Sequence, residues 1–324
     1  MNVAIIGAGL IGRKRANALP KGVNLSTVCD TDQQKAKELA RDFKCESETN
    51  WRNVTSDPKI QAVIIATINK YLSPIAQEAI SFGKHILVEK PGARNLRELE
   101  KIARVYKKKT VLVFGYNHRY HPGIVMAKKI VDSKKYGNIL FIRAKYGHGG
   151  RLGYEKEWRF NKDLSGGGEL LDQGTHLIDL VNYLCGEMTE VYGLTGKLFW
   201  KSDLEDSSFF ILKNKNGQIA HLSATCVEWK NLFCLEIMTQ RAKIQIDGLG
   251  GSYGKEKLTL YKMKPEMGPP ETQEFLFDEE DTSWRDETED FFDRIDKKKF
   301  SDKSIRDASY VLSIVEKLYR KNSL

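Results

Sequence analysis

Apolar runs and amphipathic stretches alternate over the first 115 residues of the chain. These runs predict strands buried on both faces at 3–6, 25–29, 62–66, 86–88 and 111–114. Helical patterns lie between them at 36–43, 74–82 and 96–106. Strands that alternate with helices predict a parallel sheet with helices on both faces.

Beyond residue 120 the pattern changes. A helix, a strand and a second helix are predicted at 123–131, 139–146 and 169–184. Residues 191–277 contain mostly strand patterns, one pair of which turns at Asn216-Gly217, so a largely antiparallel sheet is expected. The chain ends in an amphipathic helix whose apolar stripe is Ile305, Ala308, Leu312, Val315 and Tyr319.

A glycine-rich turn follows the first predicted strand and opens a helix. Its sequence is Gly7-Ala8-Gly9-Leu10-Ile11-Gly12. In such a motif the first glycine permits the tight turn, the second lets a pyrophosphate approach the backbone, and the third lets the helix pack on the strand. The motif predicts a dinucleotide site in which Gly7, Gly9, Leu10, Ile11 and Gly12 face the cofactor.

Asp30 closes the second predicted strand. A carboxylate there can accept hydrogen bonds from a ribose and would repel a 2′-phosphate, so NAD is expected as cofactor and NADP is disfavoured. Lys35 and Lys37 lie nearby and could offset that repulsion. The alternative is a plain glycine turn with Asp30 as a helix cap.

Two domains are expected in a chain of 324 residues. The first is an α/β NAD-binding Rossmann domain at 1–120. The second, at 121–324, is an α+β domain with a large, mostly antiparallel sheet that serves substrate binding and oligomerisation.

Composition excludes several classes of protein. The net charge of +9 suits nucleic acid or an acidic substrate, but the basic residues are dispersed, which favours a solvated surface. Five cysteines without a C-x-x-C pair favour free thiols in the cytoplasm over disulfides or zinc. No signal-peptide pattern and no apolar run of about 18 residues is present in the sequence, so neither export nor a membrane span is expected.

Lys90 follows the strand at 86–88 in the sequence Glu89-Lys90-Pro91. Open α/β sheets bind ligands at the carboxyl ends of their strands. An ammonium group there can hold a substrate hydroxyl and stabilise an alkoxide as hydride leaves. The alternative is a solvated lysine before a turn proline.

Asp172 and His176 lie four residues apart in the helix predicted at 169–184, so they share one face. An Asp–His pair is a common way to hold an imidazole for proton transfer. Two alternatives remain open. One is a solvated polar face continued by Asp179 and Tyr183, and the other is a metal site, which no further cluster of ligands accompanies.

These motifs occur in an order that resembles the Gfo/Idh/MocA oxidoreductases, the family of glucose–fructose oxidoreductase and inositol 2-dehydrogenase. The resemblance covers nearly the whole chain and includes Gly115-Tyr116-Asn117-His118-Arg119-Tyr120 and the glycines 166–168. It implies a catalytic trio in which His176 is the general acid/base, Lys90 positions the substrate hydroxyl and Asp172 orients both. It also implies that Glu89, Lys90 and Asn117 contact the cofactor and that Arg119 lies near the substrate.

One segment departs from the family pattern. Where the family often has Thr-Pro-Asn and then a histidine, this chain has Thr67-Ile68-Asn69 and no histidine before Ser73. Cofactor contacts from Thr67 and Asn69 are still expected, but the edge toward the substrate differs.

The glycine-rich segment 149–159 resembles family members encoded among surface-polysaccharide genes, which act on sugars or nucleotide sugars. Tyr154, Trp158 and Arg159 offer an aromatic platform and an anion clamp for substrate. A disordered loop with one anchoring tryptophan is the alternative.

The expected activity is NAD(H)-dependent hydride transfer to or from a hydroxyl or keto carbon of a sugar, nucleotide sugar or inositol-like polyol. A dinucleotide-binding regulator without turnover and an NAD-dependent glycosidase are the alternatives. A homodimer or homotetramer is expected, because a sheet with helices on one side leaves its other face bare, and Phe210, Leu212 and Leu222 are the candidates for that surface. The Lys90–Pro91 bond is expected to be cis.

Overall fold

The computed structural model describes residues 1–278 and 280–321. The chain divides into two compact units. The first unit contains residues 1–117, 163–166 and 284–312, and the second contains the remaining described residues. The expected division near residue 120 remains a prediction. The units differ from it chiefly because residues 284–312, near the end of the chain, belong with the first unit.

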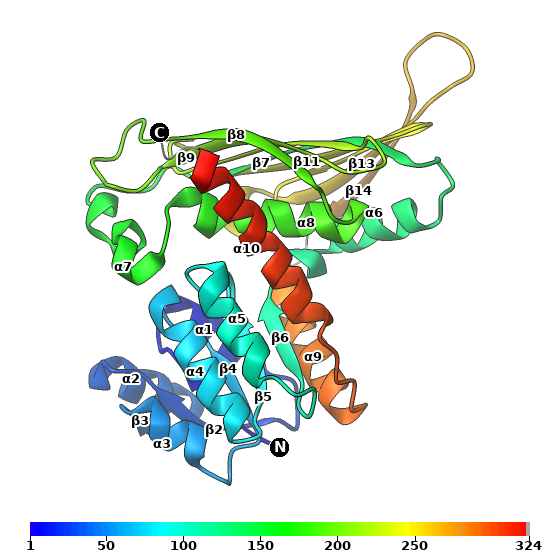
Figure 1. Cartoon of the computed structure of the whole chain (residues 1–324). Coiled ribbons are helices and arrows are strands. Elements are labelled where there is room, and N and C mark those ends of the chain that lie inside the picture. Colours follow the sequence, from blue (N-terminus) through cyan, green and yellow to red (C-terminus); the bar gives the residue numbers. More distant parts are fainter. Residues whose placement is uncertain (279, 322–324) are drawn as a thin grey trace. The chain divides into compact units, whose positions relative to one another are not determined.

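The first unit is built on a six-stranded sheet (Figure 1). Its strands, in the spatial order β3-β2-β1-β4-β5-β6, are β1 (Asn2–Ile6), β2 (Asn24–Cys29), β3 (Glu46–Glu48), β4 (Ala62–Ile65), β5 (His85–Glu89) and β6 (Leu112–Gly115). Every neighbouring pair is parallel, which confirms the predicted parallel sheet. Only β3 was not predicted, because it has three residues and none of them is apolar.

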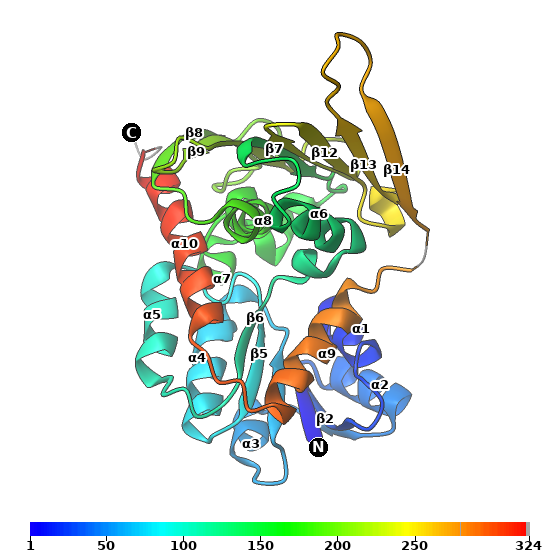
Figure 2. The same ribbon diagram turned by 90° about the vertical axis from the view of Figure 1, so that its right-hand side faces the viewer.

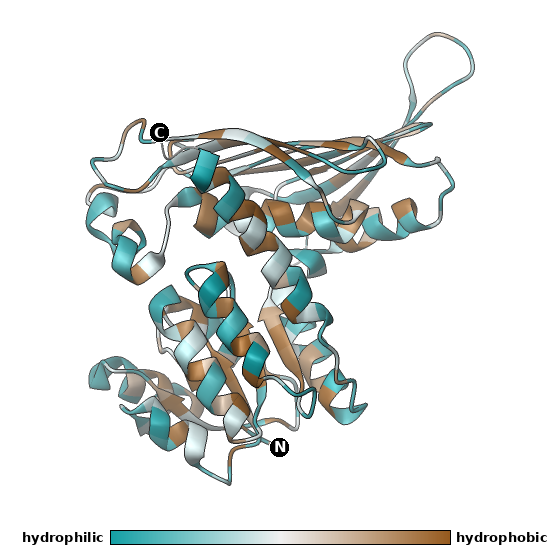
Figure 3. Cartoon of the chain, viewed as in Figure 1, coloured by the Kyte–Doolittle hydropathy of each residue, from teal (hydrophilic) through white to brown (hydrophobic). Residues whose placement is uncertain are grey.

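Helices cover both faces of this sheet, and α4 and α5 lie on the face opposite to α1, α2 and α9 (Figure 2). The helices of the unit include α1 (Leu10–Asn17), α2 (Gln33–Phe43), α3 (Trp51–Ser56), α4 (Asn69–Ser81), α5 (Leu96–Val105), α7 (Lys162–Ser165) and α9 (Ser283–Asp296). The apolar strands are brown in Figure 3, and residues such as Ile5, Ile64 and Leu87 are fully buried. Phe291 of α9 joins the same core, which explains why this late segment belongs to the first unit.

The second unit contains an eight-stranded sheet. Its strands, in the spatial order β14-β13-β12-β11-β7-β10-β9-β8, are β7 (Ile139–Gly147), β8 (Glu190–Gly196), β9 (Ser207–Lys213), β10 (Ile219–Thr225), β11 (Leu232–Thr239), β12 (Ala242–Asp247), β13 (Glu256–Lys262) and β14 (Glu271–Phe277). All neighbouring strands are antiparallel except β7 and β10. The predicted mostly antiparallel sheet is therefore confirmed, including the hairpin that turns at Asn216-Gly217.

Helices α6 (Pro122–Asp132) and α8 (Thr175–Cys185) cover one face of this sheet (Figure 2). The remaining helical segments are η1 (Asn117–Tyr120), η2 (Tyr154–Lys156), η3 (Trp158–Phe160), η4 (Leu170–Gly174), η5 (Gly251–Tyr253) and α10 (Lys303–Lys321). In α10 the predicted apolar stripe is buried from Ile305 to Val315. Among the described residues, no helix combines the length and the apolar character that a membrane crossing requires.

The structure corrects the expected surface for association. Phe210, Leu212 and Leu222 are 2%, 0% and 0% exposed, so they lie on the face that the helices cover. The open face carries their neighbours in sequence, and Phe209 and Ile211 are 47% and 44% exposed. Because side chains alternate along a strand, the prediction was wrong by one residue in register.

Candidate cofactor and catalytic sites

The glycine-rich turn has the geometry of a phosphate cradle. Gly7 has a φ of +109°, and a Cβ on Gly12 would overlap the carbonyl oxygen of Gly7. No heavy atom lies within 4 Å of the place where a Cβ on Gly9 would be, so this glycine faces open space. Gly9 is also the N-cap of α1 and makes no side-chain cap, so the first N–H groups of α1, those of Leu10 and Ile11 among them, receive no acceptor from a capping side chain. A pyrophosphate fits here because the helix N-terminus offers it N–H donors and a positive dipole.

Asp30 lies at the end of β2 and contacts this turn directly. Its Oδ2 accepts a hydrogen bond from the N–H of Ala8 at 2.7 Å, and its Oδ1 accepts one from the N–H of Asp32 at 2.9 Å. The N-cap of α2 is Asp32, whose carboxylate accepts from the N–H groups of Gln34 and Lys35. The alternative in which Asp30 only caps a helix is therefore wrong. Asp32 also forms an ion pair with Lys35 at 3.1 Å, which ties up one of the two lysines that could attract a 2′-phosphate.

The segment after β4 is engaged within the first unit. The hydroxyl of Thr67 donates to the carbonyl oxygen of Ile68 at 3.2 Å. Asn69, which is 8% exposed, donates through Nδ2 to the carbonyl oxygen of Ser165 at 2.8 Å. The Asn69 amide thus anchors residues 163–166, and the expected cofactor contacts of Thr67 and Asn69 remain predictions.

Lys90 is half-buried and follows the carboxyl end of β5, at the sheet edge where it was expected. The Lys90–Pro91 bond is cis, as predicted. Glu89 is 6% exposed, and its carboxylate accepts hydrogen bonds from the buried Arg15. Glu89 was expected to contact the cofactor, but its carboxylate is bound to this arginine. Asn117 is buried just beyond the end of β6, and its cofactor contact stays a prediction.

In the second unit the helix expected at 169–184 is not uniform. A π-helical turn, η4, spans Leu170–Gly174 and contains Asp172, and α8 then begins at Thr175 and ends before Gly186. Single turns of π-helix inside longer helices are rare in proteins, and those that occur often lie at functional sites. Asp172 and His176 therefore lie on either side of a change in helix pitch, which the sequence pattern did not predict.

A buried carboxylate fixes the start of this helix. Glu205 accepts hydrogen bonds from the N–H groups of Gly168 and Leu170 at 3.2 Å each, and from the hydroxyl of Tyr319 at 2.7 Å. Burial raises the pKa of Glu205 despite these three donors. A Cβ on Gly168 would overlap the carbonyl oxygen of Glu205, so the glycine is needed for this close approach. Glu205 is a positioning residue that sequence analysis missed, because it lies 35 residues from Leu170.

His176 is buried, with 4% of its surface exposed, and Asp179 is fully buried. The alternative of a solvated polar face is therefore wrong. The ring of His176 stacks on that of His118, with centroids 3.7 Å apart and an interplanar angle of 26°. Tyr146 contacts both imidazoles from the side, at centroid distances of 5.1 and 5.9 Å. His118 is a second imidazole at the candidate base, and the sequence contained it only as part of a motif.

Asp172 and Arg119 each belong to an ion pair. Oδ2 of Asp172 lies 3.1 Å from Nε of Arg159. Arg119 donates to both carboxylate oxygens of Asp179, at 2.8 and 2.5 Å. A bidentate pair of this kind holds an arginine firmly. Arg119 was expected near the substrate, but the structure commits its guanidinium to α8.

The aromatic segment 154–160 differs from the expected open platform. Tyr154 is 4% exposed and packs edge-on against Phe160 and Trp200, at centroid distances of 5.2 and 5.8 Å. Trp158 is half-buried and lies beneath Arg159, whose guanidinium is 4.9 Å from the ring. Tyr154 is thus packed inside a cluster with Phe160 and Trp200 and offers no exposed surface for stacking. Trp158 keeps part of its surface exposed.

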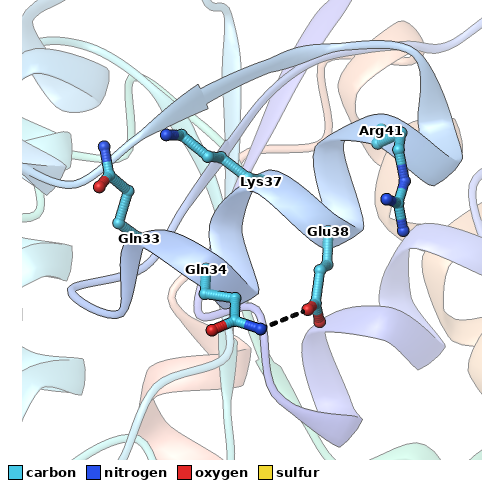
Figure 4. A pocket seen from close by; sticks show the side chains of 5 residues that line it. All are labelled: Gln33, Gln34, Lys37, Glu38 and Arg41. Atoms are coloured by element: carbon cyan, nitrogen blue, oxygen red, sulfur yellow. Dashed lines mark hydrogen bonds between the residues drawn. The ribbon is translucent and has the colours of Figure 1, made fainter.

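Two further features bear on ligand binding. Within residues 1–278 and 280–321, no group of three or more histidine, cysteine, aspartate or glutamate side chains is arranged to hold a metal ion. A shallow hollow beside α2 is lined by Gln33, Gln34, Lys37, Glu38 and Arg41 (Figure 4). All of its residues come from the exposed face of one helix, and Gln34 donates to Glu38 at 3.0 Å, so this hollow carries none of the predicted chemistry.

Two family models match separate parts of the sequence. Residues 1–117 match the model of an oxidoreductase family with an NAD-binding Rossmann fold. Residues 124–252 match the model of the Gfo/Idh/MocA C-terminal domain.

Two curated relatives are dehydrogenases. A levoglucosan dehydrogenase from Pseudarthrobacter phenanthrenivorans is 34% identical over 208 residues, which are 59% of this chain and 53% of the relative. A glucose-6-phosphate 3-dehydrogenase from Bacillus subtilis is 32% identical over 187 residues, which are 56% of this chain and 53% of the relative. The match therefore spans only a little over half the length of either relative.

A solved structure of levoglucosan dehydrogenase in complex with NADH and levoglucosan has the same fold. It has a TM-score of 0.90 over 99% of this chain and 96% of that chain, at 24% sequence identity. Because the two family models together match both the N-terminal and the C-terminal part of the sequence, the chain belongs to the Gfo/Idh/MocA oxidoreductase family.

Proposed function

We propose that this protein is an NAD(H)-dependent oxidoreductase that transfers hydride between the nicotinamide and a hydroxyl or keto carbon of a sugar-like polyol. The observation that carries the proposal is the buried His176, which stacks on His118 just after the π-helical turn that bears Asp172. A protein that only senses dinucleotide needs no such imidazole. Family membership and the open cradle at Gly9 support NAD as the hydride carrier.

The chemistry divides among this chain's own residues. Oxidation of a secondary alcohol needs a base for the hydroxyl proton, and we assign that proton to the imidazole of His176. The ammonium group of Lys90 donates a hydrogen bond to the same oxygen and stabilises the charge that develops on it. Asp172 orients the two groups. The glycine turn at 7–12 and Asp30 would hold NAD(H), which would provide the hydride acceptor for oxidation and the hydride donor for reduction.

The ion pairs around Asp172 favour a neutral substrate. The guanidinium of Arg159 lies 3.1 Å from Asp172 and 3.4 Å from Glu157, so two carboxylates of the chain already share its charge. The anion clamp expected at Arg159 would have to give up one of these partners to hold a phosphate. We therefore favour a neutral sugar or inositol over a phosphorylated sugar.

The proposal is tested by incubating the purified protein with NAD or NADH and a panel of sugars, nucleotide sugars and inositols while nicotinamide absorbance is followed. Turnover of a neutral polyol is the expected result. Tightly retained NAD without net turnover would favour the glycosidase alternative. Normal NAD binding with no reaction on any member of the panel would favour the regulator.

Cofactor choice gives a first prediction. We expect the protein to bind NAD(H) more tightly than NADP(H), because Asp30 would face a 2′-phosphate. The substitution Asp30→Asn removes the charge and retains an oxygen that can accept from the N–H of Ala8, so the preference should shrink by about tenfold. Calorimetric titration of both cofactors measures it, with Glu38→Gln on α2 as a control. Equal binding of both cofactors by the native protein would contradict the prediction.

Self-association gives a second prediction. We propose that two copies pack through the open face of the eight-stranded sheet, where Phe141, Phe209, Ile211 and Ile219 are 36–47% exposed. Apolar side chains that are exposed together on one sheet face are a common feature of interfaces. Light scattering should give a dimer or tetramer for the native protein and a monomer for the double variant Phe209→Glu/Ile211→Lys. Phe82→Glu, which changes an exposed apolar residue outside this sheet, should leave the oligomer intact.

The thiols support a cytoplasmic location, which we also propose. All five cysteines are free. Burial raises the pKa of Cys29 and of Cys234 to about 12, so both are protonated and unreactive at neutral pH. Thiols left unpaired in this way suit a reducing compartment.

A further inference from the structure

Arg15 lies in α1, three residues after the last glycine of the motif, and is fully buried between two carboxylates. Its Nε and Nη2 lie 2.6 and 2.5 Å from Oε1 of Glu89, and Nη2 lies 2.6 Å from Oε2 of Glu287 in α9. Nη1 donates to the hydroxyl of Thr288 at 3.3 Å. The indole of Trp284 covers the guanidinium at 4.7 Å.

Stability alone is a poor reason for such a cluster. Burying three charged groups costs more in desolvation than their attraction usually returns, and well-packed apolar residues of the same size often do better. Burial would lower the pKa of Arg15, but the charges of Glu89 and Glu287 raise it, so the guanidinium stays charged. A cluster of this kind is best explained by the geometry that it enforces.

The cluster fixes the backbone at the carboxyl end of β5, directly before Lys90. Glu89 pairs with Gly115 of β6 in the ladder, and the N–H of Gly92 donates to the carbonyl oxygen of Glu89 at 3.0 Å. A Cβ on Gly115 would lie 2.7 Å from Nη2 of Arg15 and 3.2 Å from Oε1 of Glu89, so the site has no spare room. The side chain and the carbonyl of Glu89 are thus both fixed, and with them the peptide that leads into Lys90.

We infer that Arg15 is a positioning residue for Lys90, which it acts on through Glu89, and that Glu287 of α9 holds Arg15 in this role. The cluster sets the direction from which the Lys90 ammonium meets its ligand. The inference rests on the proposed function only in that Lys90 is the residue that contacts substrate.

Two conservative substitutions test it. Glu287→Gln removes one charge and keeps a hydrogen-bond acceptor, and Arg15→Lys keeps the charge and loses the planar fork. The control is Arg13→Lys in the same helix, where Arg13 forms an exposed pair with Asp42 at 2.7 Å. The first readout is the pH-dependent rate at which acetic anhydride labels Lys90, quantified by mass spectrometry against the exposed Lys37 and independent of enzyme activity.

We expect the Lys90 labelling profile to change in both variants and to match the native profile in Arg13→Lys. Turnover should fall by about tenfold or more in both variants while the dissociation constant of NAD is unchanged, because small misplacements of a catalytic group are costly. Native labelling and native turnover in both variants, with only a lower melting temperature, would overturn the inference and would show that the cluster only stabilises the fold.

The two proposals fail in different ways. If the labelling of Lys90 changes but no polyol reacts even with the native protein, the positioning role stands and the proposed function is wrong. If Arg15→Lys does not fold, Glu287→Gln decides the question alone. Glu287→Gln with unaltered Lys90 labelling would then refute the positioning role.

Discussion

Replacing His176 with alanine is expected to lower turnover by about 10²- to 10⁴-fold, which is the range that a positioned acid/base group contributes. At neutral pH a sugar hydroxyl does not ionise unaided, so the reaction depends on the imidazole to take its proton. The affinity for NAD(H) should stay nearly unchanged, because the glycine turn and Asp30 belong to the first unit whereas His176 lies in the second. Steady-state kinetics and calorimetry on the same preparation separate the two effects.

The matched control is His221→Ala, because His221 is an exposed imidazole on β10 of the same unit. It should retain native turnover. Lys90→Ala should lose turnover as His176→Ala does, and should in addition show a higher KM for the polyol. Near-native turnover in both His176→Ala and Lys90→Ala would show that the mechanism is wrong for this protein and would favour the regulator.

Local features of the sequence predicted the architecture well. The parallel sheet follows from apolar runs separated by helical patterns, and the roles of Gly7 and Gly12 follow from a steric requirement that acts over a few residues. The weakest point was the choice of face in the second sheet. Four apolar residues follow one another at 209–212, so alternation gives two faces without indicating which one the helices cover.

The candidate site was harder to predict because its contacts join distant residues. In the sequence, a polar residue such as Asp179 suggests a solvated helix face. In the structure Asp179 is buried, and its charge is compensated by Arg119, which lies 60 residues away in the sequence. The hydrogen bonds of Glu205 to Gly168 and Leu170, and the stacking of His118 on His176, likewise cannot be predicted from a hydropathy pattern. Lys90, Asp172 and His176 were singled out from a strand end and from a shared helix face, whereas their roles as a trio came from the family resemblance and remain predictions that the variants above test.

The second large effect is expected for the stability of the first unit. Arg15→Met should lower its free energy of unfolding by about 3–5 kcal/mol, because the two buried carboxylates of Glu89 and Glu287 lose the cation that compensates them. Urea unfolding followed by tryptophan fluorescence measures the loss, and Trp284 reports from a position against the substituted side chain. Arg13→Met removes an exposed ion pair in the same helix and should cost less than about 1 kcal/mol.

The loss should also depend on pH with a defined sign. In Arg15→Met two carboxyl groups would lie buried beside each other with no cation between them, and burial of this kind favours the protonated form of a carboxyl group. The folded variant then binds more protons than the unfolded chain, so its stability falls as pH rises. The difference from the native protein should therefore be larger at pH 8 than at pH 5. A loss of the same size at both pH values would mean that the carboxylates find other partners, and the cluster would then not depend on Arg15 for its charge balance.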